Sequence, residues 1–187
     1  MKKISTGFLL VWLFLSCTAD KTFVIEGTLP HSKYNGELVF LLPFAEKGSE
    51  RVDSVLVENK TFRFEGKADS AEVWILRMRH LLRMDIQEHL IMIEPGNIWV
   101  QLDSVSSSGG TPQNDKLQEW KEARLKSHKI THLLWTMSRQ ASHDSIKQQI
   151  RSRWEQENTA FKEFSRRFAQ ENKGTEVARF VLEITDP

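Results

Sequence analysis

Two histidines, His128 and His132, have the spacing of metal ligands. They are four residues apart, so on a helix their rings lie one turn apart, as in helices that offer two ligands to zinc. A zinc-dependent hydrolase of that type needs a glutamate directly after the first histidine, and Lys129 occupies that place. Zinc also needs a third protein ligand, and only His143 is near in sequence. We therefore predict surface histidines without a native metal, and a hydrolase is the least favoured function.

Other catalytic patterns are missing from the sequence. It contains no Gly-x-Ser-x-Gly elbow for a nucleophilic serine and no glycine-rich phosphate loop of either standard spacing. The carboxylates of Asp85, Glu88 and Glu94 could flank a cleft, but an acid pair is defined by its separation in space. We expect no catalytic residue, no cofactor and no enzymatic activity.

The only cysteine, Cys17, directly follows a segment with the properties of an export signal. Two lysines precede an apolar run from Ile4 to Leu15, which as a helix is about 18 Å long, short of the roughly 30 Å core of a bilayer. The junction resembles a bacterial lipobox, with a serine before the cysteine and Phe14 in place of the usual leucine. That resemblance implies that residues 1–16 are a signal peptide and that Cys17 is lipidated. The alternative is an ordinary secretory signal that contains a cysteine by chance.

Lipidation at Cys17 would anchor the mature chain to a membrane, because two or more acyl chains hold a protein stably where one would exchange. Residues 17–21 then form a lipidated tether, and the protein faces the periplasm or the cell surface. Because the sequence has no other cysteine, it excludes an intrachain disulfide, a Cys-x-x-Cys redox pair and a thiolate metal site.

The composition is that of a globular protein with no affinity for nucleic acid. Hydrophobic residues make up 40% and charged residues 27% of the 187 residues, which is ordinary globular usage. Without the two lysines of the signal, 24 of the 26 basic side chains remain against 25 acidic ones. A net charge near −1 is not that of a protein built to bind nucleic acid.

Residues 22–104 have the short apolar segments and turn residues of a β domain. About seven strands are expected, near residues 22–29, 37–42, 51–58, 61–67, 71–79, 89–94 and 97–103. Seven strands at this spacing predict an antiparallel β-sandwich or a partly open barrel. A turn at Asn59-Lys60 would place Val57 opposite Phe62. A second turn, Glu94-Pro95-Gly96-Asn97, would pair Ile93 with Ile98.

Residues 105–110 are rich in serine and glycine and are expected to be a hinge. Residues 111–187 have helical spacing. Thr111 is the expected N-cap of a helix of about 27 residues, which a short connection at 141–144 joins to a second, antiparallel helix. Thr175 would cap a short last helix. The expected fold class is therefore α+β, with the sandwich or barrel followed by a helical hairpin and a short terminal helix.

The two long helices carry apolar stripes that should be buried. The first stripe contains Trp120, Ala123, Ile130, Leu134 and Met137, and the second contains Ile146, Ile150, Trp154, Phe161, Phe164 and Phe168. Trp99 points away from its neighbours on a strand. It either packs beneath the helical hairpin, which is the favoured interpretation, or lines a binding surface. The apolar and basic segment 80–84 could face a partner or extend a strand.

Four short motifs, in their order, resemble a family of Bacteroidota lipoproteins, the domain of unknown function 4369. They are Phe23-Val24-Ile25-Glu26-Gly27, Val57-Glu58-Asn59-Lys60-Thr61-Phe62-Arg63-Phe64-Glu65-Gly66, Ile93-Glu94-Pro95-Gly96-Asn97-Ile98 and Gly110-Thr111-Pro112-Gln113-Asn114-Asp115. The resemblance covers about residues 22–184. In many members this region precedes a thioredoxin-like domain with a Cys-x-x-Cys pair. The chain is expected to stop where that domain would begin, so no catalytic residue is carried over.

These observations predict an envelope-anchored lipoprotein that acts as a non-enzymatic binding or interaction module. Its expected partners are the membrane, through the N-terminal lipid, and an envelope protein or a small ligand. The alternative is an accessory module of a thiol-disulfide redox system that acts with a separate, thioredoxin-like catalytic chain.

Overall fold

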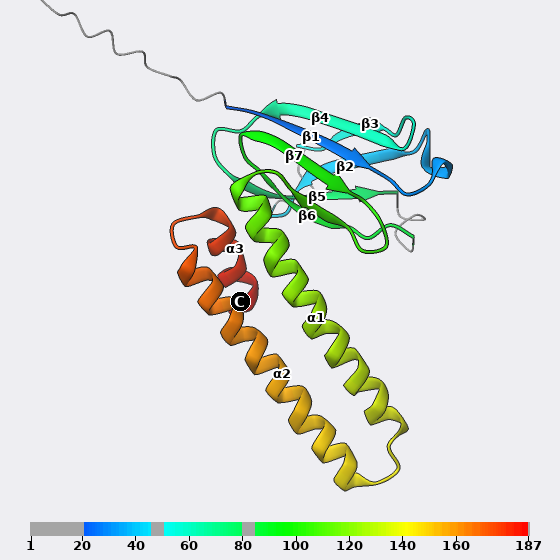
Figure 1. Ribbon diagram of the computed structural model, residues 1–187, viewed down its shortest axis with the longest axis vertical. Helices are drawn as coiled ribbons and strands as arrows, with labels where there is room; N and C mark the ends of the chain where they lie inside the picture. Colours follow the sequence, from blue (N-terminus) through cyan, green and yellow to red (C-terminus); the bar gives the residue numbers. More distant parts are fainter. Residues whose placement is uncertain (1–20, 46–50, 80–84, 187) are drawn as a thin grey trace, which may run out of the picture.

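The computed structural model describes residues 21–45, 51–79 and 85–186. Cys17, the signal peptide 1–16 and the segment 80–84 lie outside the described residues. The described chain has a β-sandwich at one end and a helical hairpin that projects from it (Figure 1).

The sandwich consists of two four-stranded sheets and is not a closed barrel (Figure 1). The strands are β1 (Thr22–Thr28), β2 (Leu38–Pro43), β3 (Asp53–Leu56), β4 (Thr61–Lys67), β5 (Glu72–Met78), β6 (His89–Ile93), β7 (Gly96–Gln101) and β8 (Ser107–Gly109). One sheet has the order β4-β1-β7-β8 and the other β3-β2-β5-β6. A short 3-10 helix, Ser32–Tyr34, follows β1. The fold class is the α+β sandwich and helices that the sequence predicts, with eight strands instead of about seven.

The sandwich core forms because alternate side chains of the strands point inward, as the period of two requires. Ile25 of β1, Leu76 of β5, Ile91 of β6 and Ile98 of β7 are almost completely inaccessible to solvent. Phe62 and Phe64 of β4 are also buried, with ring centroids 6.0 Å apart. Val57, Phe62, Ile93 and Ile98, which the two expected turns place on one face, are all buried.

The expected strand neighbours are partly wrong. Asn59 and Lys60 form the predicted two-residue turn, with φ of 51° and 65°, but only Glu58 and Thr61 pair across it. Beyond that pair, β3 and β4 belong to different sheets, as do β6 and β7 on either side of the Glu94–Asn97 turn. The alternation of apolar and polar residues determines which face of a strand is buried. It does not distinguish a hairpin within one sheet from a turn that leads from one sheet to the other, because both leave the apolar faces in the same core.

The sheets are also not wholly antiparallel, because β1 lies parallel to β7, with Ile25 opposite Ile98. β1 pairs antiparallel with β4 on its other side, so the first strand is a central strand of its sheet. A parallel pair needs a long connection between its strands. β2 to β6 lie between β1 and β7 in the chain and include the whole second sheet.

The helices are α1 (Pro112–Gln140), α2 (Asp144–Glu171) and α3 (Glu176–Thr185). α1 and α2 form the predicted antiparallel hairpin, and α3 lies against its base (Figure 1). A second core joins this base to the sandwich. It contains Val73, Met92, Leu117, Trp120, Phe168, Ala169, Val177, Ala178, Phe180 and Val181. The indole N–H of Trp120 donates to Ser165 Oγ at 3.0 Å, which satisfies a buried polar group between α1 and α2.

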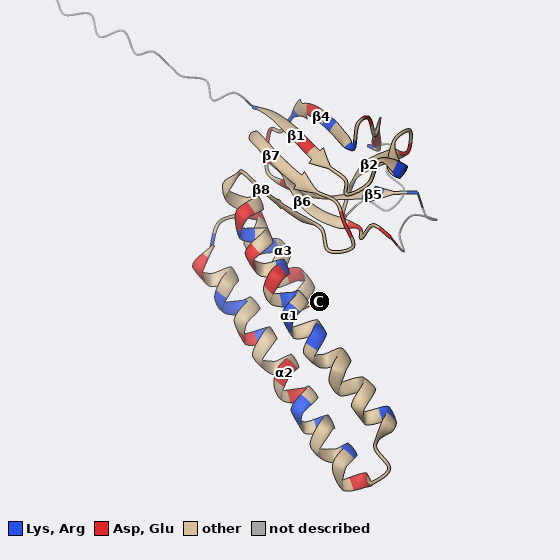
Figure 2. Ribbon diagram, turned by 45° about the vertical axis from the view of Figure 1, so that its right-hand side comes forward, with Lys and Arg blue, Asp and Glu red and all other residues tan. Residues whose placement is uncertain are grey.

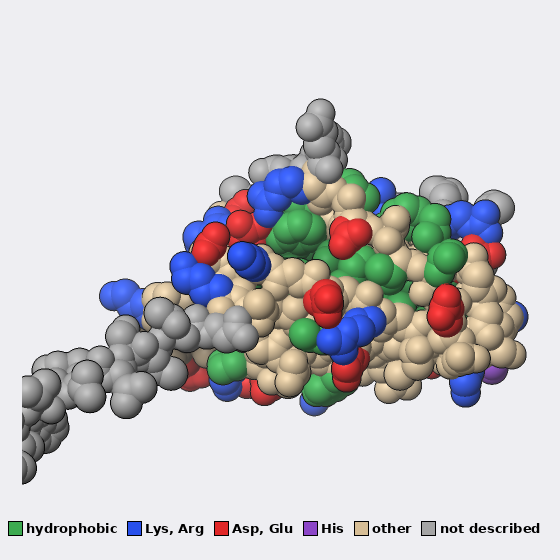
Figure 3. Space-filling model, turned by 90° about the horizontal axis from the view of Figure 1, so that it is seen from above, with side chains coloured by type: hydrophobic (Ala, Val, Ile, Leu, Met, Phe, Trp, Pro, Cys, Tyr) green, Lys and Arg blue, Asp and Glu red, His purple; other side chains and the backbone are tan. Residues whose placement is uncertain are grey.

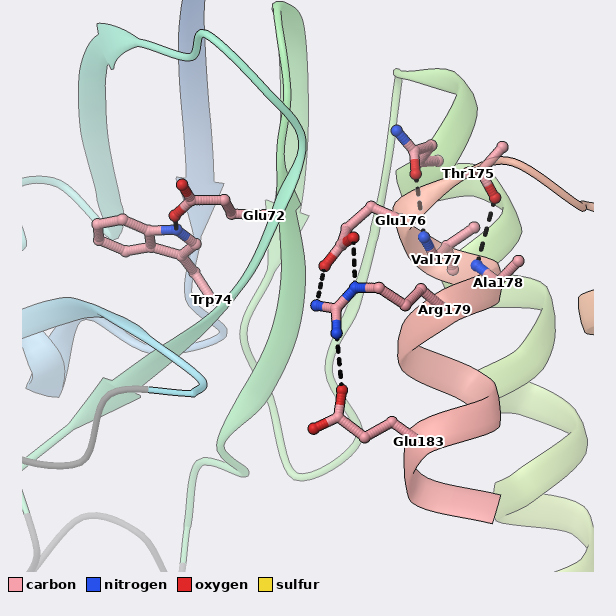
Figure 4. A network of polar contacts seen from close by, with 9 residues as sticks. Glu72, Trp74, Thr175, Glu176, Val177, Ala178, Arg179 and Glu183 are labelled. Atoms are coloured by element: carbon pink, nitrogen blue, oxygen red, sulfur yellow. Dashed lines mark hydrogen bonds and ion pairs between the residues drawn. The ribbon is translucent and has the colours of Figure 1, made fainter. Parts of the chain in front are cut away.

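α3 begins at Thr175, whose hydroxyl accepts a hydrogen bond from the N–H of Ala178 at 3.3 Å, as the cap prediction requires (Figure 4). Its outer face carries Arg179, which pairs with Glu176 and with Glu183 at 2.9 Å (Figure 4). These hydrogen bonds raise the pKa of Arg179. Its inner face is apolar, so α3 closes the side of the second core next to β5.

The hairpin extends beyond the part that α3 covers, and we call residues 124–154 the distal arm. In this region the predicted apolar stripes are partly wrong. Met137, Ile146 and Trp154 are 46%, 44% and 45% exposed, and Ile150 is buried. Helical spacing predicts which side chains share a face, but not how far a helix continues past the elements that cover that face. No helix in the described part of the chain is both long enough and apolar enough to span a membrane.

Candidate functional site

The carboxylate of Glu94, just after β6, holds the first turn of α1. Its Oε1 accepts hydrogen bonds from Thr111 Oγ1 at 2.6 Å and from the N–H groups of Gln113 and Asn114 at 2.8 and 3.3 Å. Thr111 is at the predicted N-cap position, but its side chain donates to Glu94 instead of capping α1. A carboxylate is favourable at a helix N-terminus because it accepts from unpaired N–H groups and lies at the positive end of the helix dipole.

Asn114 fixes α1 to the edge of β6. Its amide donates to the C=O of Met92 at 2.8 Å and accepts from the N–H of the same residue at 2.9 Å. The neighbouring Gln113 reaches the other side of the base, where its Oε1 accepts from the N–H of Val177 at 3.0 Å. The first turn of α1 therefore sets the direction of the hairpin relative to both β6 and α3.

The segment expected to be a hinge, residues 105–110, contains β8 and packs closely. A Cβ atom on Gly109 would lie 2.7 Å from the ring of Trp99, and one on Gly110 would lie 2.5 Å from the C=O of Asn97. The N–H of Gly110 also donates to Asp115 at 2.9 Å. These glycines therefore make room for Trp99 and the start of α1. Trp99 belongs to β7, and its ring is 49% exposed and lies beside Gly109 of β8, so the expectation that it packs beneath the hairpin is wrong.

An open cleft of about 360 Å³ lies between β6 and α1, and the side chain of Lys121 forms part of its wall. Lys121 Nζ is 2.9 Å from His89 Nε2, 3.0 Å from the C=O of Leu90 and 3.2 Å from Ser108 Oγ. Each of the three protons of its ammonium group therefore has an acceptor. Lys121 joins α1 to both sheets, through β6 and β8.

Burial changes the protonation of this pair, because an ionised group is less stable away from water. Burial lowers the pKa of Lys121 to about 7, and the nearby carboxylate of Glu122 opposes this shift. Burial, followed by the charge of Lys121, lowers the pKa of His89 well below its ordinary value. A neutral His89 is consistent with Nε2 accepting a hydrogen bond from Lys121. No local sequence pattern indicates this pair, because its members are 32 residues apart.

The structure does not bring the predicted acids together. Glu94 holds α1, whereas Asp85 pairs with Lys33 at 2.9 Å and that hydrogen bond lowers the pKa of Asp85. Glu88 lines the cleft, and its Oε1 lies 4.0 Å from Nη1 of Arg77. The three carboxylates therefore have separate partners.

His128 and His132 are exposed on α1, as predicted, with ring centroids 6.3 Å apart. His143 is exposed in the loop before α2. Across residues 21–45, 51–79 and 85–186, no three His, Cys, Asp or Glu side chains come close enough together to hold a metal ion. The candidate lipidation site, Cys17, lies outside the described residues.

The two histidines belong to a strip of aromatic and basic side chains along the distal arm. The ring of His132 is 5.8 Å from that of Trp135, and the guanidinium of Arg139 lies 4.9 Å from the Trp135 ring. Their spacing of three or four residues places them on one face of α1. Their spacing in the sequence singles out the two histidines but does not indicate Trp135 as their neighbour.

Comparison with protein families matches residues 23–117 to the family described as Domain of unknown function (DUF4369). The matched segment contains both sheets, Glu94 and the first turn of α1. No curated protein and no solved structure matches the chain.

Proposed function

The chain belongs to the DUF4369 family, and we propose that it is a lipid-anchored, non-enzymatic binding module of the cell envelope whose distal arm engages another envelope component. The family's description assigns no activity. The proposal therefore depends on the residues of this chain.

The observation that carries the proposal is the set of large hydrophobic side chains that the distal arm exposes. Leu133 and Trp135 are 59% and 52% exposed, and Met137, Ile146 and Trp154 are each exposed by 44% or more. Several large apolar side chains exposed on one segment are typical of an interaction surface. The rigid base of the hairpin, fixed by Glu94 and Asn114, holds this surface away from the sandwich (Figure 1).

The polar residues of the described chain also favour binding over catalysis. The partly buried Lys121–His89 pair uses its hydrogen bonds within the fold, and the candidate acids have separate partners. A nucleophile with an adjacent base and an oxyanion site is the usual sign of an active site. The proposed anchor at Cys17 precedes β1, which lies at the opposite end of the molecule from the distal arm (Figure 1).

Site-specific photocrosslinking in intact cells tests the proposal. A photoreactive residue at Leu133 or Met137 should give adducts with an envelope component, and one at Glu65, exposed on β4, should not. Adducts of equal yield at all three positions, or none at the arm, would contradict a binding role for the arm. A thioredoxin-like chain in the adduct would instead support the redox accessory role.

A further inference from the structure

We propose that the component engaged by the distal arm is the surface of an anionic phospholipid membrane, and that the end of the hairpin inserts among its headgroups. This inference rests on the proposed function and names the partner of the same surface. Charge, the placement of the apolar side chains and their depth along the hairpin each support it.

The distal arm is strongly basic, although the whole chain has a net charge of only +1. Residues 124–154 contain seven Lys or Arg side chains and one acidic side chain, Asp144. The ribbon in Figure 2 is coloured by residue type, and Lys and Arg positions outnumber Asp and Glu positions on the outer turns of the hairpin. Basic segments are attracted to anionic leaflets. On the sandwich end of the molecule, by contrast, basic and acidic side chains are interspersed (Figure 3).

The exposed apolar side chains surround the distal arm instead of forming one face. Leu133 and Trp135 are two residues apart, so they point about 200° from each other around the axis of α1. Ile146 and Trp154 extend the apolar surface to α2. A partner with a single flat face would cover only one side of this surface. A headgroup layer covers every side at once because it closes around an inserted end.

Four of the five exposed apolar side chains lie at the depth that insertion requires, and the fifth, Trp154, lies about 15 Å from the end of the hairpin. At about 1.5 Å per residue, Met137 and Ile146 lie within about 5 Å of the end of the hairpin and Leu133 and Trp135 within about 11 Å. A helix that lies in the membrane plane buries its apolar face about 5–10 Å into the headgroup boundary, and the end of the hairpin would enter to a similar depth. Tryptophan suits this layer because its ring is apolar and its N–H is polar.

A second copy of the chain fits this surface poorly. Two distal arms would bring together two segments with a formal net charge of +6 each, and like charges repel at close range. An acidic protein would satisfy the charge, but its surface would have to surround the arm. The membrane is therefore the partner that satisfies both charge and shape.

Vesicle binding tests the inference. The protein used begins at residue 18, so it lacks the candidate anchor and contains every described residue. It should co-sediment with vesicles of phosphatidylglycerol and phosphatidylcholine, and not with phosphatidylcholine alone. Binding should weaken as salt is added, because salt screens exposed charges. The emission of the exposed tryptophans should shift to shorter wavelength on binding.

Matched variants separate charge from folding. Lys147→Glu with Arg151→Glu should weaken vesicle binding at least tenfold. The same charge change near the base of α2, Lys162→Glu with Arg167→Glu, should alter it less than twofold. All four side chains are exposed, so the melting temperature should be retained in both variants. Leu133→Ser with Trp135→Ser should also weaken binding, because insertion needs apolar side chains.

The inference would be overturned if the protein did not bind the anionic vesicles, or if the two charge variants lost vesicle affinity equally. If vesicles are not bound and the arm crosslinks to one acidic protein in cells, the inference is wrong and the proposed function stands. If vesicles are not bound and no adduct forms at the arm, both are wrong.

Discussion

The side-chain amide of Asn114 takes the position of a neighbouring strand beside Met92, because it bonds both the N–H and the C=O of that residue. β6 is an edge strand of its sheet, and Asn114 is completely buried. α1 is therefore joined to the sandwich by a contact that imitates sheet hydrogen bonding.

We predict that Asn114→Ala lowers the free energy of unfolding by about 2 to 4 kcal/mol, because it leaves a buried N–H and a buried C=O of Met92 without partners. Urea denaturation measures this loss. Gln148→Ala is the matched control, since it removes an exposed amide from α2 and should change stability by less than about 0.5 kcal/mol. Equal stability of the two variants would show that the Asn114 contact contributes little.

Lys121 should make the protein more stable as the pH rises from about 7 to 10.5. Its pKa is lowered from 10.5 to about 7 in the folded chain, so the unfolded chain binds more protons in this window. The free energy of unfolding should therefore rise by up to about 1.4 kcal/mol per pH unit. Urea denaturation of wild type and Lys121→Met across this range checks the prediction. The difference in slope should disappear below pH 7, and identical slopes throughout would contradict it.

If Cys17 is lipidated, the Cys17→Ala variant should differ from wild type in two ways. Its signal peptide should not be cleaved before residue 17, and it should not be held in the membrane by acyl chains. Intact-mass measurement should show the acylated form only for wild type. Ser16 is the control position, because Ser16→Ala keeps a small residue before the cysteine and should preserve the modification. If Cys17→Ala is processed and partitions into detergent as wild type does, the anchor assignment is wrong.

His128 and His132 should be dispensable for metal content and for folding. Both side chains are exposed, and zinc requires at least three protein ligands. The double alanine variant should have the zinc content and melting temperature of wild type, as measured by elemental analysis and thermal denaturation without a histidine tag. One equivalent of zinc in wild type, absent from the variant, would overturn this prediction.

The sequence predicts the class of the fold and the buried residues beside its two turns better than it predicts strand neighbours. Asn59 and Lys60 adopt the positive φ of the expected turn, yet the strands on either side enter different sheets. Local turn chemistry acts over a few residues. The choice of sheet depends on contacts such as that between Ile25 and Ile98, which lie far apart in the chain.

The base of the hairpin was less predictable than its helices. Glu94 and Thr111 both belong to motifs that suggested the family, but only the fold shows that they are bonded to each other. Lys121 and His89 have no local pattern that distinguishes them from surface residues. The exposure of Trp154 could not be predicted either, because its spacing is that of a buried stripe and the covering helix α3 ends before reaching it.

The central position of β1 has a mechanical consequence if the chain is tethered at Cys17. Tension transmitted through residues 18–21 acts on Thr22 along the axis of β1, which is hydrogen-bonded to β4 on one side and to β7 on the other. Such a load shears both rows of hydrogen bonds together instead of opening them one at a time. The strand next to the tether is therefore the part of the sandwich best placed to resist extraction by force.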